Sequence, residues 1–498
     1  MSDLPRLDAR QLPAADPGAP GLSRPVRAVQ FGTGALLRGL VDDAFDRAAR
    51  DGRWDGRAVA VSQTGSGRGA AFNEQDGLFT IRERGVEGGE TVERARVVTA
   101  VARALSAQDD WDKVIALARD RAVELVVSNT TEIGLTWDDG DDAQAEPPRS
   151  FPAKLAAWLR ARQRAADGDD GWGVVVLPTE LVEDNGAVLR DLVLRWGDRA
   201  GWGSGFVDFV AGCTFADTLV DRIVTGTPPD LAAAERAVGW ADPLMTDAEP
   251  YRLWAIEGDD ALRQRLAFAD GEAVVVAGDI GPFRVRKVRL LNAAHTLLVP
   301  VALGCGVETV EGAVTDPAVG PFLDRLFEDL VPAVERELAQ AGAEPETARP
   351  FARSVRDRLA NPAVRHELVG IALHQTAKLR ARVVPALAHA DAPEAVALGV
   401  AAYLLLQKAA AGLDGLHFPG LDPSALPADA DAGPVREAWQ RATSPGDLVR
   451  RVLSDAGLWG ADLSGGPFEA AVARHLRTAQ AEGIPAAVES LLSVPSAR

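Results

Sequence analysis

Three side chains that could move a proton or hold a reacting oxygen occur close together between Lys287 and His295. The amine of Lys287, the carboxamide of Asn292 and the imidazole of His295 stand in a mostly apolar segment. If this segment is helical, Asn292 and His295 share a face, and Lys287 lies near the helix start, where it can approach them. Such a trio is suited to reducing a carbonyl group or oxidising an alcohol.

The same spacing also fits a basic helix start whose Asn and His form hydrogen bonds inside a core. Arg284, Arg286 and Arg289 surround Lys287 with like charge, which favours release of its proton and supports the catalytic interpretation. The spacing alone leaves both interpretations open.

The composition predicts a protein that avoids nucleic acid and membranes. Its 498 residues include 53 Lys and Arg against 72 Asp and Glu, so the formal net charge is -19 and the overall field repels phosphate backbones. The chain has no secretion signal at its start and no run of roughly 20 apolar residues that could span a bilayer. We therefore expect a cytoplasmic protein, with Cys213 and Cys305 as small buried hydrophobes rather than a disulfide or a metal site.

The apolar pattern predicts two domains of different class. Residues 1–23 are rich in Pro, Ala, Asp and Gly without an apolar period, which predicts a flexible arm. Short apolar strands then alternate with amphipathic helices, which predicts an α/β, doubly wound, Rossmann-like dinucleotide-binding domain over residues 24–282. Two runs at 72–85 and 90–100 predict a hairpin insertion within it. Residues 283–498 show helical period, for example at 366–388, and predict a mainly α-helical substrate-binding domain.

A glycine turn between the first strand and the first helix predicts a nucleotide-binding loop. The strand Val26–Gln30 leads through Gly32, Thr33 and Gly34 into a helix at 40–49. Glycines in this position let the backbone approach a pyrophosphate, and the helix start behind them supplies N–H donors.

Two further strands end in polar loops at the same edge of the predicted sheet. The loop after the second strand contains Gln63 and Arg68 but no Asp or Glu, whereas an acidic residue there usually binds the ribose of NAD. The choice between NAD and NADP therefore stays open. Asn129, Thr130 and Thr131 follow another buried strand, at the carboxyl end where open parallel sheets bind ligands.

Later polar residues have two interpretations each. Asn185, before Gly186, is either a carboxamide donor at the sheet edge or a turn residue. Asp217, Asp221 and Arg222 stand in apolar sequence and predict either a buried ion pair or a site.

No metal is expected. The acidic stretch 138–148 lacks the pattern of a calcium loop and reads as a solvated surface loop, and the six histidines show no ligand spacing.

Together these motifs resemble the long-chain polyol dehydrogenase family, which includes mannitol 2-dehydrogenase and the hexuronate oxidoreductases. Lys287, Asn292 and His295 stand in the family's lysine, asparagine and histidine pattern, and Asn185 in its Asn-Gly motif. The run Val220-Asp221-Arg222-Ile223 matches its Val-Asp-Arg-Ile motif. The resemblance covers nearly the whole chain and is strongest to the hexuronate branch, in the runs 63–68, 73–78, 128–132 and 290–296.

The resemblance implies an NAD-dependent oxidoreductase, with NADP not excluded, that interconverts a keto-hexuronate and its aldonate of the tagaturonate and altronate type by hydride transfer. It implies Lys287 as general acid and base, Asn185 and Asn292 as holders of the substrate oxygen, and His295 as a group that orients hydroxyls. The residues that it implies at the cofactor are Gly32, Thr33, Gly34, Leu36, Leu37, Arg38, Gln63, Arg68, Asn129, Thr130 and Thr131.

The expected partner is a small sugar acid. The resemblance implies Asp221, Arg365, His366 and Lys378 as substrate-binding residues, and the last three form a cationic set that suits a carboxylate. Gly370 replaces an arginine of mannitol-type relatives and a serine of the hexuronate branch, where His374 replaces an asparagine. A polyol 2-dehydrogenase of the mannitol and fructose type, or a sugar-acid or nucleotide-binding protein without turnover, are the alternatives.

Overall fold

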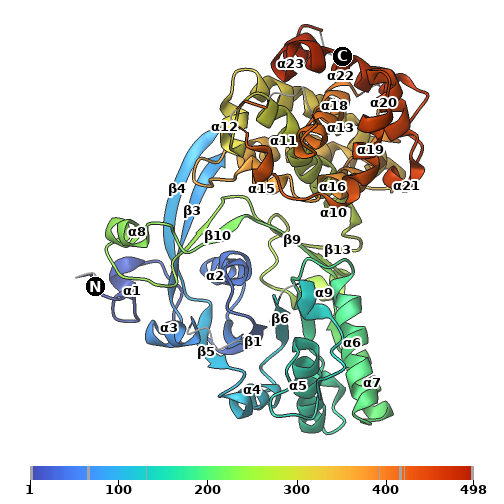
Figure 1. The fold of residues 1–498 in the computed structure, drawn as a ribbon. Coiled ribbons are helices and arrows are strands. Elements are labelled where there is room, and N and C mark those ends of the chain that lie inside the picture. The colour runs from blue at the N-terminus through green and yellow to red at the C-terminus, as the bar shows by residue number, and fades with distance from the viewer. Residues whose placement is uncertain are drawn as a thin grey trace. The chain divides into compact units, whose positions relative to one another are not determined.

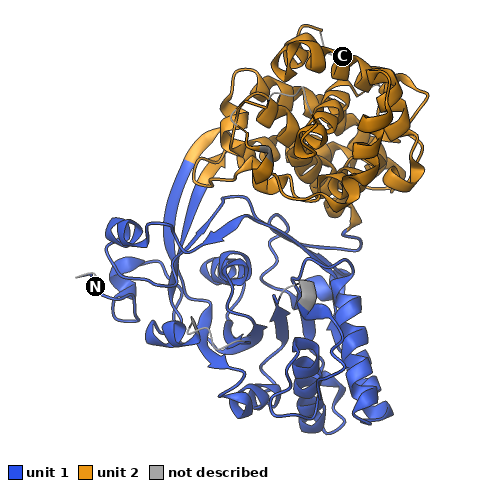
Figure 2. Ribbon diagram, viewed as in Figure 1, with its two compact units in different colours: residues 1–84, 92–280 blue, residues 85–91, 281–498 orange. Residues whose placement is uncertain are grey.

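The chain folds into two compact units. The computed structural model describes residues 4–63, 68–130, 132–391, 393–413, 418–419 and 421–494. Unit 1 comprises residues 1–84 and 92–280, and unit 2 comprises residues 85–91 and 281–498 (Figure 2). The second unit thus starts at Gly281, and it also includes seven residues that the sequence assigned to the first domain.

Unit 1 is built on a six-stranded parallel sheet in the order β5-β2-β1-β6-β7-β8 (Figure 1). Strands and helices alternate along the chain and the strand order reverses beside β1, which is the doubly wound, Rossmann-like arrangement that the sequence predicted. The strands are β1 (Val26–Phe31), β2 (Arg57–Ser62), β5 (Val101–Ser106), β6 (Leu125–Ser128), β7 (Val175–Pro178) and β8 (Thr214–Phe215), and the helices are α2 (Asp43–Arg50), α3 (Arg68–Glu74), α4 (Trp111–Ala118), α5 (Phe151–Ala166), α6 (Asn185–Arg199), α7 (Ser204–Ala211), α8 (Leu231–Val238) and α9 (Asp260–Arg265).

Each face of this sheet has its own core, because alternate residues of a strand point to opposite sides. Ala28 and Ala60 lie on the face that packs against α2 and against the three-stranded sheet β13-β12-β9. Val29 and Val61 lie on the other face, which packs against α4, α5 and α6. The strands of the small sheet are β9 (Thr218–Asp221), β12 (Leu253–Glu257) and β13 (Val274–Ala277).

The predicted hairpin insertion is present. Its strands β3 (Phe79–Glu87) and β4 (Glu90–Val98) turn at two left-handed glycines, Gly88 and Gly89. The first strand starts later than predicted, because residues 72–74 belong to helix α3. The hairpin forms a four-stranded sheet with β10 (Val224–Gly226) and β11 (Thr246–Ala248).

The prediction of a flexible arm at residues 1–23 is wrong for the part of it that the structure describes, residues 4–23. Leu7 and Leu12 are buried together with Leu78 and Val97, and a short helix, α1 (Leu12–Ala15), forms among them. The Leu7 amide donates to the Ala241 carbonyl at 3.0 Å. Two leucines five residues apart anchor the segment without producing a periodic pattern, which is why the sequence pattern did not reveal the burial.

Unit 2 is helical beyond Gly281, as the sequence predicted. Its longest apolar helix, α18, packs against α11, α13 and α22. The helices are α10 (Gly281–Arg286), η4 (Lys287–Asn292), α11 (Ala293–Gly304), α12 (Val310–Thr315), α13 (Val319–Gln340), α14 (Ala348–Leu359), α15 (Leu368–Ile371), α16 (Gln375–Arg382), α17 (Val384–Leu387), α18 (Glu394–Ala410), α19 (Gly433–Arg441), α20 (Pro445–Leu453), α21 (Ala456–Trp459), α22 (Pro467–Glu482) and α23 (Ile484–Leu492).

The helical run predicted at 366–388 is interrupted. His374 has the left-handed backbone conformation, with φ of 53°, and separates α15 from α16, and Val383 separates α16 from α17. Among the described residues, no helix is both long and apolar enough to cross a bilayer.

Candidate functional site

The glycine loop lies at the carboxyl end of β1, where the sequence placed it. Gly32 has φ of +133°, and a Cβ added to it would lie 2.7 Å from Leu37 and 2.9 Å from the Asn129 carbonyl oxygen. A Cβ on Gly34 would have no described neighbour within 4 Å. Gly32 therefore permits the tight turn, and Gly34 leaves space for a ligand beside the backbone.

The helix after this loop begins with a π-helical segment, η1 (Leu37–Asp42). Leu37 is fully buried in the core, and its side chain packs beneath the backbone at Gly32. The buried guanidinium of Arg38 donates to the Thr33 carbonyl at 2.7 Å and to the Thr246 hydroxyl at 2.9 Å. These bonds brace the loop, and direct contact of Leu36, Leu37 or Arg38 with a cofactor stays a prediction.

The π-helical segment η1 ends at a buried carboxyl group, that of Asp42. Asp42 and Gln30 are both fully buried, and their side chains lie 3.5 Å apart. Burial raises the pKa of Asp42 to about 7, although the contact with Gln30 and the charge of Arg38 oppose the rise.

The loop after β6 is fixed by a carboxylate that the sequence analysis did not single out. Glu180 accepts from the Thr130 amide at 2.9 Å, from the Thr130 hydroxyl at 3.0 Å and from the Ser128 hydroxyl at 3.0 Å. The Asn129 carboxamide donates to the Thr179 carbonyl at 3.0 Å. Asn129 and Thr130 are therefore held at the strand end, while Thr131 lies outside the described residues.

The loop after β2 offers one unsatisfied polar atom. The side-chain nitrogen of Gln63 is buried and has no hydrogen-bond partner among the described residues. Residues 64–67 and the side chain of Arg68 lie outside the described part of the chain. An open glycine turn and a buried amide in need of an acceptor, on neighbouring parallel strands, fit a dinucleotide.

Asn185 is buried at the start of α6 and makes only backbone contacts in the described structure. Its side-chain nitrogen lies within hydrogen-bond distance of the carbonyls of Pro178, Glu180 and Thr218, and its oxygen accepts from the Thr218 amide at 2.9 Å. Both amide hydrogens are thus engaged. This geometry fits a residue that joins the end of β7 to β9, and the predicted role as a donor to substrate stays untested.

The contacts of Asp217 and Arg222 are those of structural residues. Asp217 accepts from the amides of Gly186 and Ala187 at 2.8 and 3.1 Å, so it satisfies the start of α6. Arg222 is fully buried and pairs with Asp43 at 2.7 Å and Glu83 at 2.6 Å. Asp221 is buried on β9, and its predicted contact with substrate stays a prediction.

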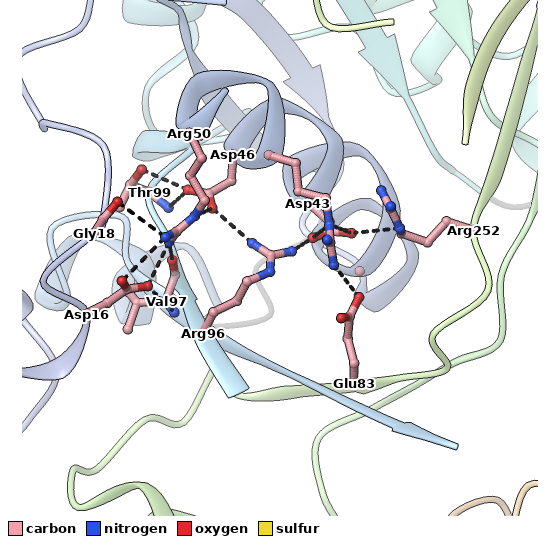
Figure 3. Close-up of polar contacts among 12 residues, drawn as sticks. Asp16, Gly18, Asp43, Asp46, Arg50, Glu83, Arg96, Val97, Thr99 and Arg252 are labelled. Atoms are coloured by element: carbon pink, nitrogen blue, oxygen red, sulfur yellow. Dashed lines mark hydrogen bonds and ion pairs between the residues drawn. The ribbon is translucent and has the colours of Figure 1, made fainter. Parts of the chain in front are cut away.

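Arg222 belongs to a larger buried arginine network, consisting of Arg47, Arg96, Arg222 and Arg252 with Asp43, Asp46 and Glu83. Figure 3 labels Arg96 and Arg252 with the three carboxylates. Both aspartates have fully buried side chains, and each is contacted by more than one arginine. Although burial by itself raises the pKa of Glu83, the charges of Arg222 and Arg47 bring it below its usual range. Its four arginines outnumber its three carboxylates, and each of these arginines has a carboxylate partner within unit 1.

In unit 2, the trio Lys287, Asn292 and His295 is organised by a second π-helical segment, η4, which runs from Lys287 to Asn292. In a regular α-helix, residues five apart are rotated by about 140° and face apart, at about 100° per residue. In a π-helix, the backbone bonds join residues five apart, so Lys287 and Asn292 come to the same side. The sequence predicted the helix but not the wide turn that aligns its ends.

His295, on the next turn, contacts a residue from a distant loop. Its ring centroid lies 5.5 Å from that of His366, with the rings tilted by 74°. His366 is exposed as a residue, yet desolvation of its imidazole, and secondly the charge of Lys378, lower its pKa. The structure thus brings together three residues that the sequence predicted: His295, His366 and Lys378.

Arg382 joins this group and was not predicted. It lies four residues after Lys378 on α16 and donates to the Thr296 hydroxyl of α11 at 3.1 Å. Desolvation, and secondly the charge of Arg382, lower the pKa of Lys378, and desolvation lowers the pKa of Arg382 as well. We call His366, Lys378 and Arg382 the unit 2 cation group. The helical spacing of 378 and 382 was the signal that could have found Arg382.

Arg365 does not share this environment, although it precedes His366. Its side chain is 70% exposed and pairs with Glu367 at 3.3 Å and Glu308 at 4.0 Å. These residues line a cavity of about 240 Å³ that also contains Asp422. Arg365 thus lies beside three carboxylates, whereas His366, Lys378 and Arg382 lie together, and the predicted contact of Arg365 with substrate stays a prediction.

No cluster of His, Cys, Asp and Glu with the geometry to hold a metal ion occurs in the described part of the chain.

Comparison with known families gives matches to both units. Residues 26–269 match the family model described as "Mannitol dehydrogenase Rossmann domain", and residues 279–477 match "Mannitol dehydrogenase C-terminal domain".

Curated relatives extend over most of the chain. It is 34% identical to altronate oxidoreductase of Bacillus subtilis (strain 168) over 453 residues, which cover 88% of this chain and 89% of that protein. It is 35% identical to altronate oxidoreductase of Yersinia pestis bv. Antiqua (strain Nepal516) over 490 residues, covering 94% and 97%.

Solved structures share the fold. A D-sorbitol dehydrogenase in substrate-free form has a TM-score of 0.74 at 22% identity, covering 94% of this chain and 96% of that one. Mannitol 2-dehydrogenase of Pseudomonas fluorescens, in a ternary complex with NAD and D-mannitol, has a TM-score of 0.65 at 21% identity, covering 98% and 100%.

Proposed function

The chain belongs to the mannitol dehydrogenase family of oxidoreductases that act on CH–OH groups, and from that premise we propose that it interconverts a keto-hexuronate and its aldonate, of the tagaturonate and altronate type. The observation that supports a sugar acid over a neutral polyol is the unit 2 cation group. Its three cations have lowered pKa values and no carboxylate partner among the described residues, so a carboxylate ligand would stabilise them.

Unit 1 supplies the cofactor-binding half of this proposal. Gly32, Thr33 and Gly34 would receive the pyrophosphate, and Gln63, Asn129 and Thr130 border the same edge of the sheet. A bound nicotinamide would supply or accept the hydride. We propose NAD as the cofactor, and NADP is tested beside it.

Unit 2 supplies the proton. In the reductive direction, the ammonium group of Lys287 would give its proton to the carbonyl oxygen of the substrate, and in the oxidative direction the free amine would take it back. Asn292, on the same side of the π-helical segment, would donate to that oxygen and stabilise the charge that develops on it. His295 would orient the neighbouring hydroxyls.

The substrate carboxylate would lie against the unit 2 cation group. Arg382 is held by its bond to Thr296, and Lys378 by a bond of 2.8 Å to the Ile371 carbonyl, so both heads are positioned before a ligand binds. In this proposal Asn185 keeps the end of β7 in place, and Asp221 contacts substrate hydroxyls.

The test combines a substrate panel with one variant. Tagaturonate, fructuronate and fructose are offered with NADH and with NADPH, and loss of reduced-nicotinamide absorbance is followed. We expect turnover of a keto-hexuronate with NADH. Preference for fructose would contradict the carboxylate argument, and ligand-induced melting shifts without turnover would indicate a binding protein.

Lys287→Ala tests the proton transfer. We expect turnover to fall by about a hundredfold or more with NADH binding retained, because general acid and base catalysis typically contributes that much. Lys113→Ala is the matched control, since Lys113 is exposed and, among the described residues, pairs with Asp110 alone. Turnover of Lys287→Ala within about tenfold of the unaltered enzyme would exclude the role.

A further inference from the structure

A hollow of about 460 Å³ lies among the helices of unit 1, away from the residues discussed so far. It is bordered by α4 from its first residue, Trp111, to Arg119 just after its end, by the second half of α5, by the segment 143–146 and by Trp202 after α6. None of the candidate cofactor residues lines it.

The lining is basic in an acidic protein. Arg119, Arg160 and Arg164 border the hollow, and Glu146 is the one acidic residue among its described lining. In the described structure, no carboxylate lies within ion-pair distance of any of the three guanidiniums, although the chain has 72 Asp and Glu against 53 Lys and Arg. Arginines nearby behave differently: Arg121 pairs with Asp169 at 3.1 Å and Arg149 with Asp138 at 2.9 Å. Three unpaired guanidiniums at one concave site therefore call for an external anion.

Arg160 is held by two contacts, and its charge is poorly stabilised by the surrounding protein. It donates to the Gln163 side chain and lies over the Trp202 ring at 5.7 Å, while its Nε is buried without a described partner. Desolvation, and secondly the like charge of Arg164, lower its pKa. An anion between Arg160 and Arg164 would remove the repulsion and satisfy the buried nitrogen.

The shape narrows the class of ligand. Trp111 and Trp202 form apolar walls, and Trp202 packs edge-to-face on Phe206 at 4.8 Å between ring centroids. A hollow of this volume is large enough for a small metabolite. We propose that it binds a small organic polyanion, carrying phosphate or several carboxylates, at a site separate from the proposed catalytic residues.

The experiment uses the full chain and two probes, inorganic pyrophosphate and citrate. Each is titrated by calorimetry at constant ionic strength, with NADH present at saturation so that the cofactor loops are occupied. We expect saturable binding of one or both probes. Binding of pyrophosphate alone would assign a phosphate ligand, and binding of citrate as tightly would assign a polycarboxylate.

Charge reversal locates the site. Arg119→Glu and Arg164→Glu should each weaken probe binding at least about tenfold, because each removes a charge-assisted contact and adds repulsion. Arg236→Glu, an exposed arginine of α8 outside the hollow, is the matched control and should change the dissociation constant less than about twofold. Arg164→Gln, at an exposed position, gives a milder form of the same loss should a reversed charge disturb folding.

Two outcomes would overturn the proposal. One is the absence of saturable binding for both probes. The other is binding that Arg119→Glu and Arg164→Glu leave as strong as Arg236→Glu does, which would assign the anion to another place on the protein.

Discussion

Two groups of cations in this protein are built on opposite principles. In the buried arginine network of unit 1, each guanidinium meets a carboxylate, and the pKa of Glu83 falls despite its burial. In the unit 2 cation group, the cations meet a hydroxyl, a carbonyl or one another. Desolvation lowers the pKa of cations in both groups, so the difference lies in their partners. The first group completes the fold, and the second has the unneutralised charge on which the proposed carboxylate binding rests.

Removing one acid from the buried arginine network should give the largest effect on stability. Asp43→Asn leaves Arg222 and Arg96 buried with one charge partner fewer, and breaking such a pair costs about 3–5 kcal/mol of unfolding free energy. Urea unfolding followed by tryptophan fluorescence measures it. Glu124→Gln, which breaks the exposed pair with Arg27, is the control and should cost less than about 1 kcal/mol. Equal losses in the two variants would remove the contrast.

The neighbouring residue sharpens the comparison. Asp42 is as buried as Asp43, but its partner is the side chain of Gln30 and it forms no ion pair among the described residues. Its folded pKa is about 7, above the ordinary value of 3.8, so the folded state binds the extra proton and stability falls as pH rises from about 4 to 7. Asp42→Asn should therefore stabilise the protein by about 2–4 kcal/mol at pH 8, at about 1.36 kcal/mol per pKa unit.

The pH dependence provides the check on Asp42→Asn. Its gain should shrink toward zero as the pH is lowered to about 3, below the ordinary value of 3.8, because Asp42 is then protonated in both states. Melting temperatures of the two proteins across that range measure the gain. A difference that stays constant with pH would show that packing, rather than ionisation, separates the variants.

Neutralising the unit 2 cation group should affect activity rather than stability. Arg382→Met removes a desolvated cation and keeps an apolar stem, so the melting temperature should hold or rise slightly, while kcat/KM for a keto-hexuronate should fall about 10- to 100-fold. Arg477→Met, at an exposed position on α22, is the control. Fructose as substrate should not show the loss, and an equal loss with fructose would indicate that Arg382 positions the helix instead.

The periodicity of apolar residues predicted the elements whose residues alternate between buried and exposed along the chain. The apolar strands, the glycine turn and the second, helical unit were all predicted, because burial on one or both faces imposes a period on the sequence. The packing of Leu7 and Leu12 was missed, because two isolated leucines leave no period. The ion pairs of Arg222 escaped for another reason, since its partners Asp43 and Glu83 lie 179 and 139 residues away in the chain.

The sequence analysis named most residues of the candidate site but did not predict how they lie relative to one another. The proximity of His295, His366 and Lys378 depends on where α15 ends and α16 begins. His374 stands just before α16 in a left-handed conformation that its residue type permits but does not require. The surroundings of Arg365 and Arg382 also escaped the sequence analysis. Arg365 pairs with its neighbour Glu367, whereas Arg382 is directed by Thr296, which lies 86 residues away in the chain.

The π-helical segment at Lys287–Asn292 changes the angle at which side chains before and after it leave the helix axis. A wide turn is equivalent to one extra residue inserted into an ordinary helix, and its effect is to rotate everything before it relative to everything after it. Lys287 stands on one side of that insertion, and Asn292 and His295 at its end and beyond. The phase of the chain at this turn, more than the identity of the residues between, decides whether the amine and the carboxamide face one direction. A relative with the same three residues on an uninterrupted α-helix would therefore direct its lysine and asparagine side chains to different sides of that helix.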